Sequence, residues 1–87
     1  MNFYTYILKS KTSGKLYIGQ TSNLAKRVKR HNSGGSNYTR GKGPWELIFS
    51  MEFSTRAEAV QIERKLKGFK NTERIYDWIK RHESSEG

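Results

Sequence analysis

The chain has 87 residues, enough for one small domain, and it carries 17 Lys and Arg against 8 Asp and Glu, a formal net charge of +9. It contains no cysteine, which excludes disulfides and thiolate metal sites. No apolar run approaches the roughly 18 residues of a membrane span, and the N-terminus lacks the apolar segment of a secretory signal. A cytoplasmic protein without a membrane anchor is therefore expected.

The positive charge is concentrated in the first half of the chain. Residues 1–45 contain nine basic side chains and no acidic one, whereas residues 46–87 contain eight of each sign. This asymmetry favours a polyanionic partner. A nucleic acid is expected rather than a membrane, because the chain has no long basic amphipathic helix. A solvated face that keeps the protein soluble is the alternative explanation.

The first predicted element is a β-hairpin. Residues 3–9 and 15–20 are rich in aromatic and β-branched side chains, which favours two strands. The residues between them are typical of a turn, in which Gly14 can adopt a positive φ angle. Two such strands so close in sequence are expected to pair antiparallel.

The turn also predicts the register of this hairpin. If the residues that flank the turn form a pair, Tyr17 lies opposite Leu8 and Gly19 lies opposite Tyr6. Tyr6 and Tyr17 then share one face of the sheet as diagonal neighbours. Because Gly19 has no side chain, open space is expected beside Tyr6.

A short basic helix and a third strand are expected next. Ser22 or Asn23 can cap a helix that runs to about His31, and the Gly-, Ser- and Asn-rich segment 32–44 is expected to be a loop. Residues 45–53 alternate between apolar and polar side chains, which predicts a strand with one buried face. The side chains expected on that face are Trp45, Leu47, Phe49, Met51 and Phe53, with Glu46, Ser50 and Glu52 opposite.

Two helices are expected to complete the domain. Residues 55–58, Thr-Arg-Ala-Glu, fit a capping box that opens a helix ending near residue 67, with Gly68 as its stop. Residues 72–81 form the last short helix, which has one apolar side. The predicted domain spans residues 1–82, and residues 83–87 are expected to be a disordered tail.

Charged side chains stand where two of these helices should be apolar. In the first helix, Arg27 and His31 lie on or beside the stripe marked by Leu24. In the helix that follows residue 55, Glu63 lies on the stripe marked by Ile62. Lysines elsewhere on these helices point away from the stripes, as solvated charges do.

Two explanations of these inward charges are open. Burying an unpaired carboxylate or guanidinium costs several kcal/mol, so Arg27 and Glu63 could form an internal ion pair. The alternative is an open cleft in which Arg27, His31, Glu63 and the two tyrosines meet a metal ion and a phosphate. A carboxylate with waters can hold Mg²⁺, and arginine presents a planar fork to phosphate oxygens. Such a cleft suits hydrolysis of a phosphodiester.

The motifs around these residues resemble those of the GIY-YIG nuclease superfamily, and the resemblance covers residues 3–80. Tyr17-Ile18-Gly19 repeats the second motif literally, whereas the first motif is reduced to Tyr4-Thr5-Tyr6. The segment 31–50 is similar to the small stand-alone bacterial branch of the superfamily. The chain also resembles the N-terminal catalytic domain of the bacterial excision-repair nuclease.

Three further residues match positions that matter in the family. Arg27 lies ten residues after Tyr17, where the family has its catalytic arginine. His31 stands four residues later, at a position that the family fills with His or Tyr. Glu63 matches the metal-binding glutamate of the family's later helix.

The resemblance implies an α+β fold, with a three-stranded antiparallel sheet flanked by about three helices. It also implies one divalent cation per active site, Mg²⁺ or Mn²⁺, held by Glu63. Water would attack the phosphorus, with Tyr17 as general base and Tyr6 assisting through hydrogen bonds. Arg27 would stabilise the phosphorane charge, and His31 would position or protonate a phosphate oxygen.

The chain also departs from the family. Gln20 follows the glycine of the second motif, where excision-repair nucleases carry a lysine. The family's late active-site asparagine has no clean match, and Asn71 is the nearest candidate. These 87 residues are expected to contain none of the additional domains that choose the substrate in familiar members.

The predicted function is a metal-dependent endonuclease on DNA, structure-selective or non-specific, that acts in repair or recombination. One alternative is a nucleic-acid-binding module that kept the scaffold and lost turnover. Another is an interaction protein whose partner brings the nucleic acid. RNA is a further possible substrate, and a monomer is favoured. The side chains expected to contact the nucleic acid are Lys26, Lys29, Arg30, Arg40 and Lys42 on the backbone, with Tyr38 stacking on an unpaired base.

Overall fold

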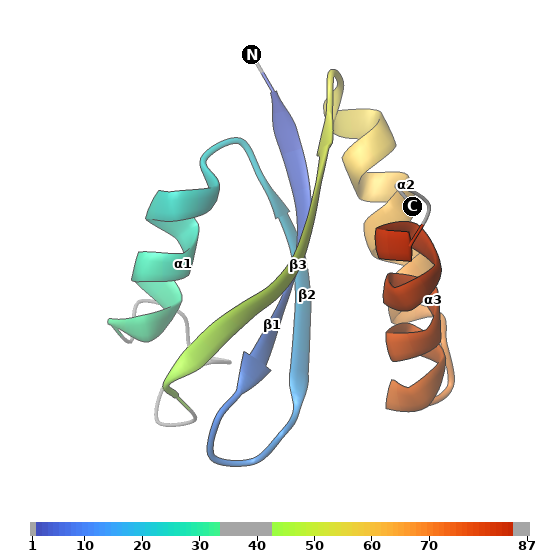
Figure 1. Ribbon diagram of the computed structural model, residues 1–87. Helices are drawn as coiled ribbons and strands as arrows, with labels where there is room; N and C mark the ends of the chain where they lie inside the picture. Colours follow the sequence, from blue (N-terminus) through green and yellow to red (C-terminus); the bar gives the residue numbers. More distant parts are fainter. Residues whose placement is uncertain (1, 34–42, 85–87) are drawn as a thin grey trace.

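The computed structural model describes residues 2–33 and 43–84. They form a three-stranded antiparallel sheet with the order β2-β1-β3 and three helices, which confirms the predicted α+β fold. Helix α1 lies on one face of the sheet, and α2 and α3 lie on the other (Figure 1). The elements are β1 (Phe3–Ser10), β2 (Leu16–Thr21), α1 (Leu24–Asn32), β3 (Trp45–Phe53), α2 (Arg56–Lys67) and α3 (Thr72–Ser84).

The β1–β2 hairpin has the predicted register. Tyr6 pairs with Gly19 and Leu8 pairs with Tyr17, and the turn contains Gly14 with a φ angle of +76°. That angle is strained for residues with a Cβ atom, which is why glycine suits this position. The register places every second side chain of both strands on the α1 face.

Local caps determine where the helices begin. The side chain of Asn23 accepts a hydrogen bond from the backbone N–H of Lys26 at 3.1 Å, so Asn23 rather than Ser22 caps α1. Thr55 caps α2 in the same way, accepting from the backbone N–H of Glu58 at 3.3 Å. Helix α2 ends at Lys67 before Gly68, as predicted.

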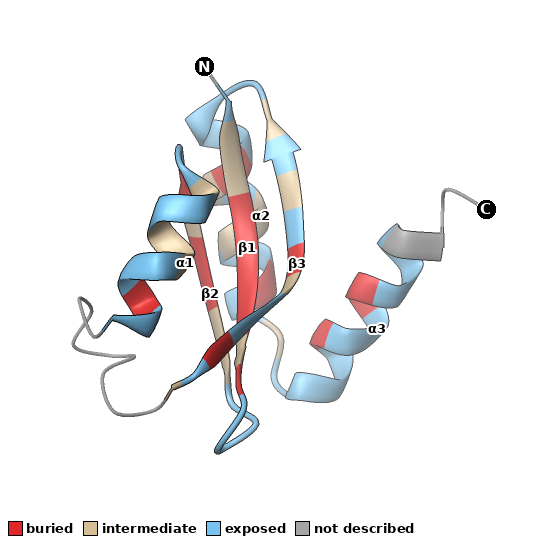
Figure 2. Cartoon of the chain, turned by 60° about the vertical axis from the view of Figure 1, so that its left-hand side comes forward, coloured by how far each residue is buried: buried red, intermediate tan, exposed pale blue. Residues whose placement is uncertain are grey.

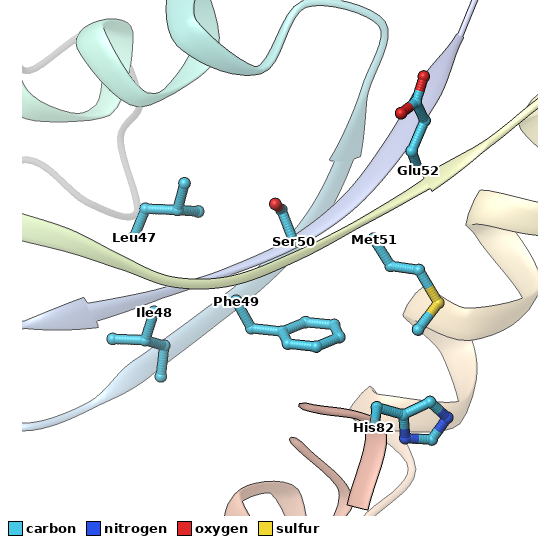
Figure 3. Close-up of a pocket in the computed structure, with 7 residues that line it drawn as sticks. All are labelled: Leu47, Ile48, Phe49, Ser50, Met51, Glu52 and His82. Atoms are coloured by element: carbon cyan, nitrogen blue, oxygen red, sulfur yellow. The ribbon is translucent and has the colours of Figure 1, made fainter. Parts of the chain in front are cut away.

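The prediction that the apolar side chains of β3 share one face is wrong. The pairing with β1 jumps from Ile7–Phe49 to Leu8–Leu47, so Ile48 is the extra residue of a β-bulge. The bulge reverses the alternation along the strand. Figure 3 shows Ile48 and Phe49 on one side of β3 and Leu47 on the other.

The bulge divides the apolar side chains of β3 between two core layers. The larger layer lies between the sheet and α2 and α3, and the smaller layer lies under α1. Trp45 belongs to the smaller layer, with Tyr6 and Leu8. The buried members of the larger layer are Ile7, Ile18, Phe49, Leu66, Ile75, Trp78 and Ile79.

The end of α1 is tied to the start of β3 through one side chain. Asn32 Nδ2 donates to the carbonyl of Trp45 at 3.1 Å, and Asn32 Oδ1 accepts from the Trp45 backbone N–H at 2.6 Å. The Asn32 amide therefore bonds to both the N–H and the carbonyl of Trp45, as a residue on a neighbouring strand would. Residues 34–42, with the predicted contacts Tyr38, Arg40 and Lys42, lie outside the described part of the chain.

The C-terminal helix is longer than predicted. Helix α3 continues to Ser84, beyond the expected end at residue 81, while residues 85–87 of the predicted tail lie outside the described residues. In the two described stretches, none of the helices combines the length and the apolar character that crossing a bilayer requires.

Candidate active site at the edge of strand β2

A buried hydrogen bond joins the hairpin to α1. The hydroxyl of Tyr6 and Nε2 of His31 lie 3.0 Å apart, and either atom can be the donor, depending on the histidine tautomer. Tyr6 is 0% exposed and His31 is 3% exposed. Figure 2 shows the buried stretch of β1 and the buried turn of α1 that carry these two side chains. The structure therefore brings these two candidate residues into direct contact.

Gly19 allows the Tyr6 side chain to cross to the neighbouring strand. A Cβ atom built on Gly19 would lie 2.6 Å from the Tyr6 hydroxyl oxygen and 2.8 Å from Cζ, closer than real Cβ contacts. The space expected beside Tyr6 is thus filled by the phenol of Tyr6 itself. The third residue of the Tyr-Ile-Gly motif is therefore a steric requirement of this site.

Tyr17 and Arg27 complete the cluster on the α1 face. The Tyr17 ring centroid lies 4.7 Å from that of His31 and 6.3 Å from that of Tyr6. Both Tyr17 and Arg27 are half-buried, in contrast to Tyr6 and His31. Arg27 precedes His31 by one turn of α1, so the two side chains lie on the same side of the helix. The cluster thus has a buried half and an accessible half.

Burial raises the pKa of the Tyr6 phenol above its usual value near 10, and the nearby Tyr17 acts in the same direction. The positive charge of Arg27 opposes this rise, and the Glu63 carboxylate adds to it. The net effect is upward, so Tyr6 keeps its proton at neutral pH. It can orient His31 or a ligand by hydrogen bonding, but it is unsuited to accept a proton from water.

Glu63 stands on α2, which covers the face of the sheet opposite α1. Its side chain is 19% exposed, and Oε2 lies 2.9 Å from Nζ of Lys67, one turn further along α2. No ion pair joins Glu63 to Arg27 within residues 2–33 and 43–84. Strand β2 is an edge of the sheet, and the Glu63 charge is one of the smaller causes, after burial, of the raised pKa of Tyr6. We therefore describe the site as lying around the β2 edge.

The donor set around Glu63 fits one kind of metal ion. Among the described residues, no group of three or more His, Cys, Asp or Glu side chains could hold a metal. A zinc site built from protein ligands does not fit this arrangement. A single carboxylate fits a hard cation such as Mg²⁺, which keeps several waters and takes further oxygens from a phosphate. Such an ion would compete with Lys67 for the carboxylate.

Basic side chains of α1 border a surface hollow beside this cluster. Lys26, Arg27 and Arg30, together with Thr21, Ser22 and Asn23, line a hollow of about 430 Å³. Lys29 is exposed on the same helix but does not line it. Asn71 lies elsewhere: its side chain accepts from the backbone N–H of Arg74 at 3.0 Å, which is the geometry of a cap for α3.

The sequence reading did not single out Arg56 or Lys67. Nη1 of Arg56 donates to Oε1 of Gln20 at 3.1 Å, and Lys67 pairs with Glu63 as described above. The sequence pattern around Arg56 predicts only a capping box. The spacing of Glu63 and Lys67, four residues apart on a helix, was a usable signal for their pair.

The fold and the cluster define a class of protein: a small α+β domain whose Tyr, Arg and His side chains meet over a Tyr-Ile-Gly hairpin. A family model described as the GIY-YIG catalytic domain matches residues 2–84. The chain belongs to this GIY-YIG family, a nuclease domain family whose members are generally metal-dependent and take nucleic acid as substrate.

Several bacterial relatives share most of the chain. It is 43% identical over 68 residues to the UPF0213 protein BH0048 of Halalkalibacterium halodurans, covering 77% of this chain and 71% of that protein. It is 46% identical over 67 residues to the UPF0213 protein YazA of Bacillus subtilis, covering 76% and 67%. The solution NMR structure of BH0048 matches with a TM-score of 0.54 and 39% identity, covering 85% of this chain and 79% of that one.

The buried histidine predicts how stability depends on pH. Burial lowers the pKa of His31 below its unfolded value of 6.5, and the charges of Arg27 and Arg30 lower it further. The unfolded state therefore binds more protons at acidic pH. The contribution of His31 to the free energy of unfolding is fully present above pH 6.5 and is lost as the pH drops below that value. Urea denaturation at pH 5 and pH 7.5 should show this loss in the wild type. It should be smaller in His31→Gln and unchanged in the control His82→Gln; equal losses in all three proteins would contradict the assignment to His31.

Proposed function

We propose that this protein is a metal-dependent endonuclease that hydrolyses phosphodiester bonds in DNA. The observation that carries the proposal is the joint placement of Tyr6, Tyr17, Arg27 and His31 on one face, with Glu63 within electrostatic range around the β2 edge. Arg27 and Glu63 do not pair with each other among the described residues, and neither is fully buried, so both can meet a charged ligand once Lys67 releases Glu63.

The proposed roles follow from the burial of each group. Tyr17 acts as the general base toward the attacking water, because it is the accessible one of the two phenols. The new P–O bond forms from that water while the bond to the leaving oxygen breaks. Arg27 donates to the non-bridging oxygens and stabilises their growing negative charge.

The two buried groups position the others. The His31 ring lies 3.0 Å from the Tyr6 hydroxyl through Nε2 and packs at a tilted angle against the Tyr17 ring, 4.7 Å away, so it limits the orientations open to both phenols. Glu63 would hold a divalent cation, Mg²⁺ or Mn²⁺, which when bound supplies positive charge to the phosphate oxygens. Substrate choice is proposed to be structure-selective or non-specific, because the inward residues of α1 belong to the site and the described elements offer no second recognition helix.

A cleavage assay with labelled substrates tests the proposal. Single-stranded, duplex, flap and four-way DNA, with one RNA strand, are incubated with the protein and Mg²⁺, Mn²⁺ or EDTA. Cutting is expected with the metals and not with EDTA. The Glu63→Gln protein should not cut, whereas Glu73→Gln, the same change on an exposed residue of α3, should cut like the wild type.

Equal cutting by the wild type and Glu63→Gln would mean a contaminating nuclease, and it would contradict the proposal. Absence of cutting by every preparation would favour the second candidate, a binding module without turnover. The observation that favours this candidate is the burial of Tyr6 and His31, which leaves only part of the cluster accessible. A binding module would still bind nucleic acid in a salt-dependent way.

A further inference from the structure

Arg56, the first residue of α2, is held in one place although it is exposed. Its Nη1 donates to Oε1 of Gln20 at 3.1 Å, and its guanidinium carbon lies 4.8 Å from the ring centroid of Phe3. Both partners stand on strands of the sheet, Gln20 on β2 and Phe3 on β1. A long side chain restrained by two rigid partners loses less conformational entropy when it binds a ligand.

The charge of Arg56 is not neutralised by a carboxylate. In the described stretches of the chain, the ion pair that forms is Lys67–Glu63, and Arg56 takes no part in it. Guanidinium carries five N–H donors, and the bond to Gln20 uses one of them. The remaining donors suit the oxygens of a phosphate, to which arginine binds as a planar fork.

Arg56 contacts the end of β2, the strand that borders the candidate active site. Gln20 pairs with Thr5, whose hydroxyl donates to the carbonyl of Ala59 at 2.7 Å, so this pair faces α2. The next residue of β2, Thr21, lines the basic hollow on the α1 side. Positive side chains therefore flank the end of β2 from both faces of the sheet.

Arg56 and Glu63, the residue proposed to bind the metal ion, stand on the same helix, α2. Arg56 and Glu63 are seven residues apart, which is about 10 Å of helix at 1.5 Å per residue and returns to nearly the same side of the helix. That length corresponds to about three nucleotides of a stacked strand at 3.4 Å each. One strand can therefore lie along this side of α2 and contact both residues.

We propose that Arg56, oriented by Gln20 and Phe3, binds a backbone phosphate that flanks the cleaved bond by about three nucleotides. Arg56 is then a substrate-binding residue outside the chemistry, and with the hollow on α1 it defines the path of the strand around the end of β2. This inference rests on the proposed function for its substrate, but binding can be measured without cleavage.

The test measures the affinity for an oligonucleotide in EDTA as a function of salt concentration. Replacing Arg56 by Gln should weaken binding and reduce the slope of log K against log salt by about 0.7 for a single strand or about 0.9 for duplex. The matched control is Arg74→Gln, which makes the same charge change on an exposed residue of α3. It should leave the slope and the affinity unchanged.

A second variant separates orientation from charge and covers the case in which Arg56→Gln folds poorly. Gln20→Ala keeps the Arg56 charge but removes its hydrogen bond, so it should keep the slope while weakening the affinity. With cleavable substrate, Arg56→Gln should raise KM and leave kcat unchanged.

Any of three results with the variants would overturn the inference. These are a wild-type slope in Arg56→Gln, a loss of slope in Arg74→Gln equal to that in Arg56→Gln, and a lower kcat with unchanged KM in Arg56→Gln. Absence of nucleic-acid binding by the wild type would overturn it as well. Binding that depends on Arg56 in a protein that never cuts would contradict the proposed nuclease activity and support the phosphate contact.

Discussion

Arg27→Gln is expected to lower kcat for DNA cleavage by about 10²–10³-fold, because it removes preorganised donors from the oxygens on which charge develops. Arg27 is half-buried on α1, and its charge already acts on the Tyr6 hydroxyl within the cluster. Glutamine keeps most of the side-chain length but loses the charge and the planar fork. Single-turnover rates at saturating DNA measure the effect, with Mg²⁺ present.

Two further variants on α1, Arg27→Lys and Lys29→Gln, test whether the lower kcat is specific to the Arg27 guanidinium. Arg27→Lys keeps the charge without the fork, so its rate should lie between those of the wild type and Arg27→Gln. Lys29→Gln makes the same charge change on an exposed residue outside the hollow, and it should alter only the affinity for DNA. An unchanged single-turnover rate in Arg27→Gln with weaker binding would make Arg27 a binding residue and contradict its proposed role.

Gly19→Ala is expected to destabilise the protein by about 1–3 kcal/mol, which is the usual cost of forcing a methyl group into a packed interior. The new Cβ atom would lie 2.6 Å from the hydroxyl oxygen of Tyr6, which is 0% exposed and is held at 3.0 Å from His31 Nε2. For a domain of this size, each kcal/mol lowers Tm by about 4–8 °C. Thermal unfolding followed by circular dichroism measures the shift.

A control variant distinguishes the steric cause of the lower stability of Gly19→Ala from backbone strain. The φ angle of Gly19 is not in the left-handed region, so alanine brings contact without backbone strain. Gly14→Ala brings backbone strain without a steric contact, since the φ angle of Gly14 is +76° and no heavy atom lies within 4 Å of the added Cβ. Gly14→Ala should therefore lower stability by about 1–2 kcal/mol and leave the rate of cleavage unchanged.

A double-mutant cycle with Tyr6→Phe isolates the contact with the phenol. Removing the hydroxyl relieves the shortest contact of the Gly19→Ala protein, although ring carbon Cζ would remain 2.8 Å away. The cost of Gly19→Ala should therefore be smaller in the Tyr6→Phe background by at least about 0.5 kcal/mol. Gly14→Ala should cost the same in both backgrounds, and additive losses for Gly19→Ala would contradict the assignment of its cost to the contact with the Tyr6 hydroxyl.

The sequence alone determined the local features of this protein. The register of the hairpin follows from the period of two and the short turn, so the sequence itself places Tyr6, Tyr17 and Gly19 on one face of the sheet. The positions of Arg27 and His31 on the inner side of α1 follow from the period of 3.6 in the same way. These relations join residues close in sequence, where chain geometry leaves few alternatives.

The tertiary structure decided the relations between distant segments. The bulge at Ile48 has no local signal, since it depends on how β3 fits both β1 and the two core layers. Arg27 on α1 and Glu63 on α2 lie on opposite faces of the sheet, where no ion pair joins them among the described residues, although the charges of both act on Tyr6. The contact of Arg56 with Gln20 spans 36 residues of sequence. Such contacts arise from the packing of whole layers, and no periodicity within a single segment encodes them.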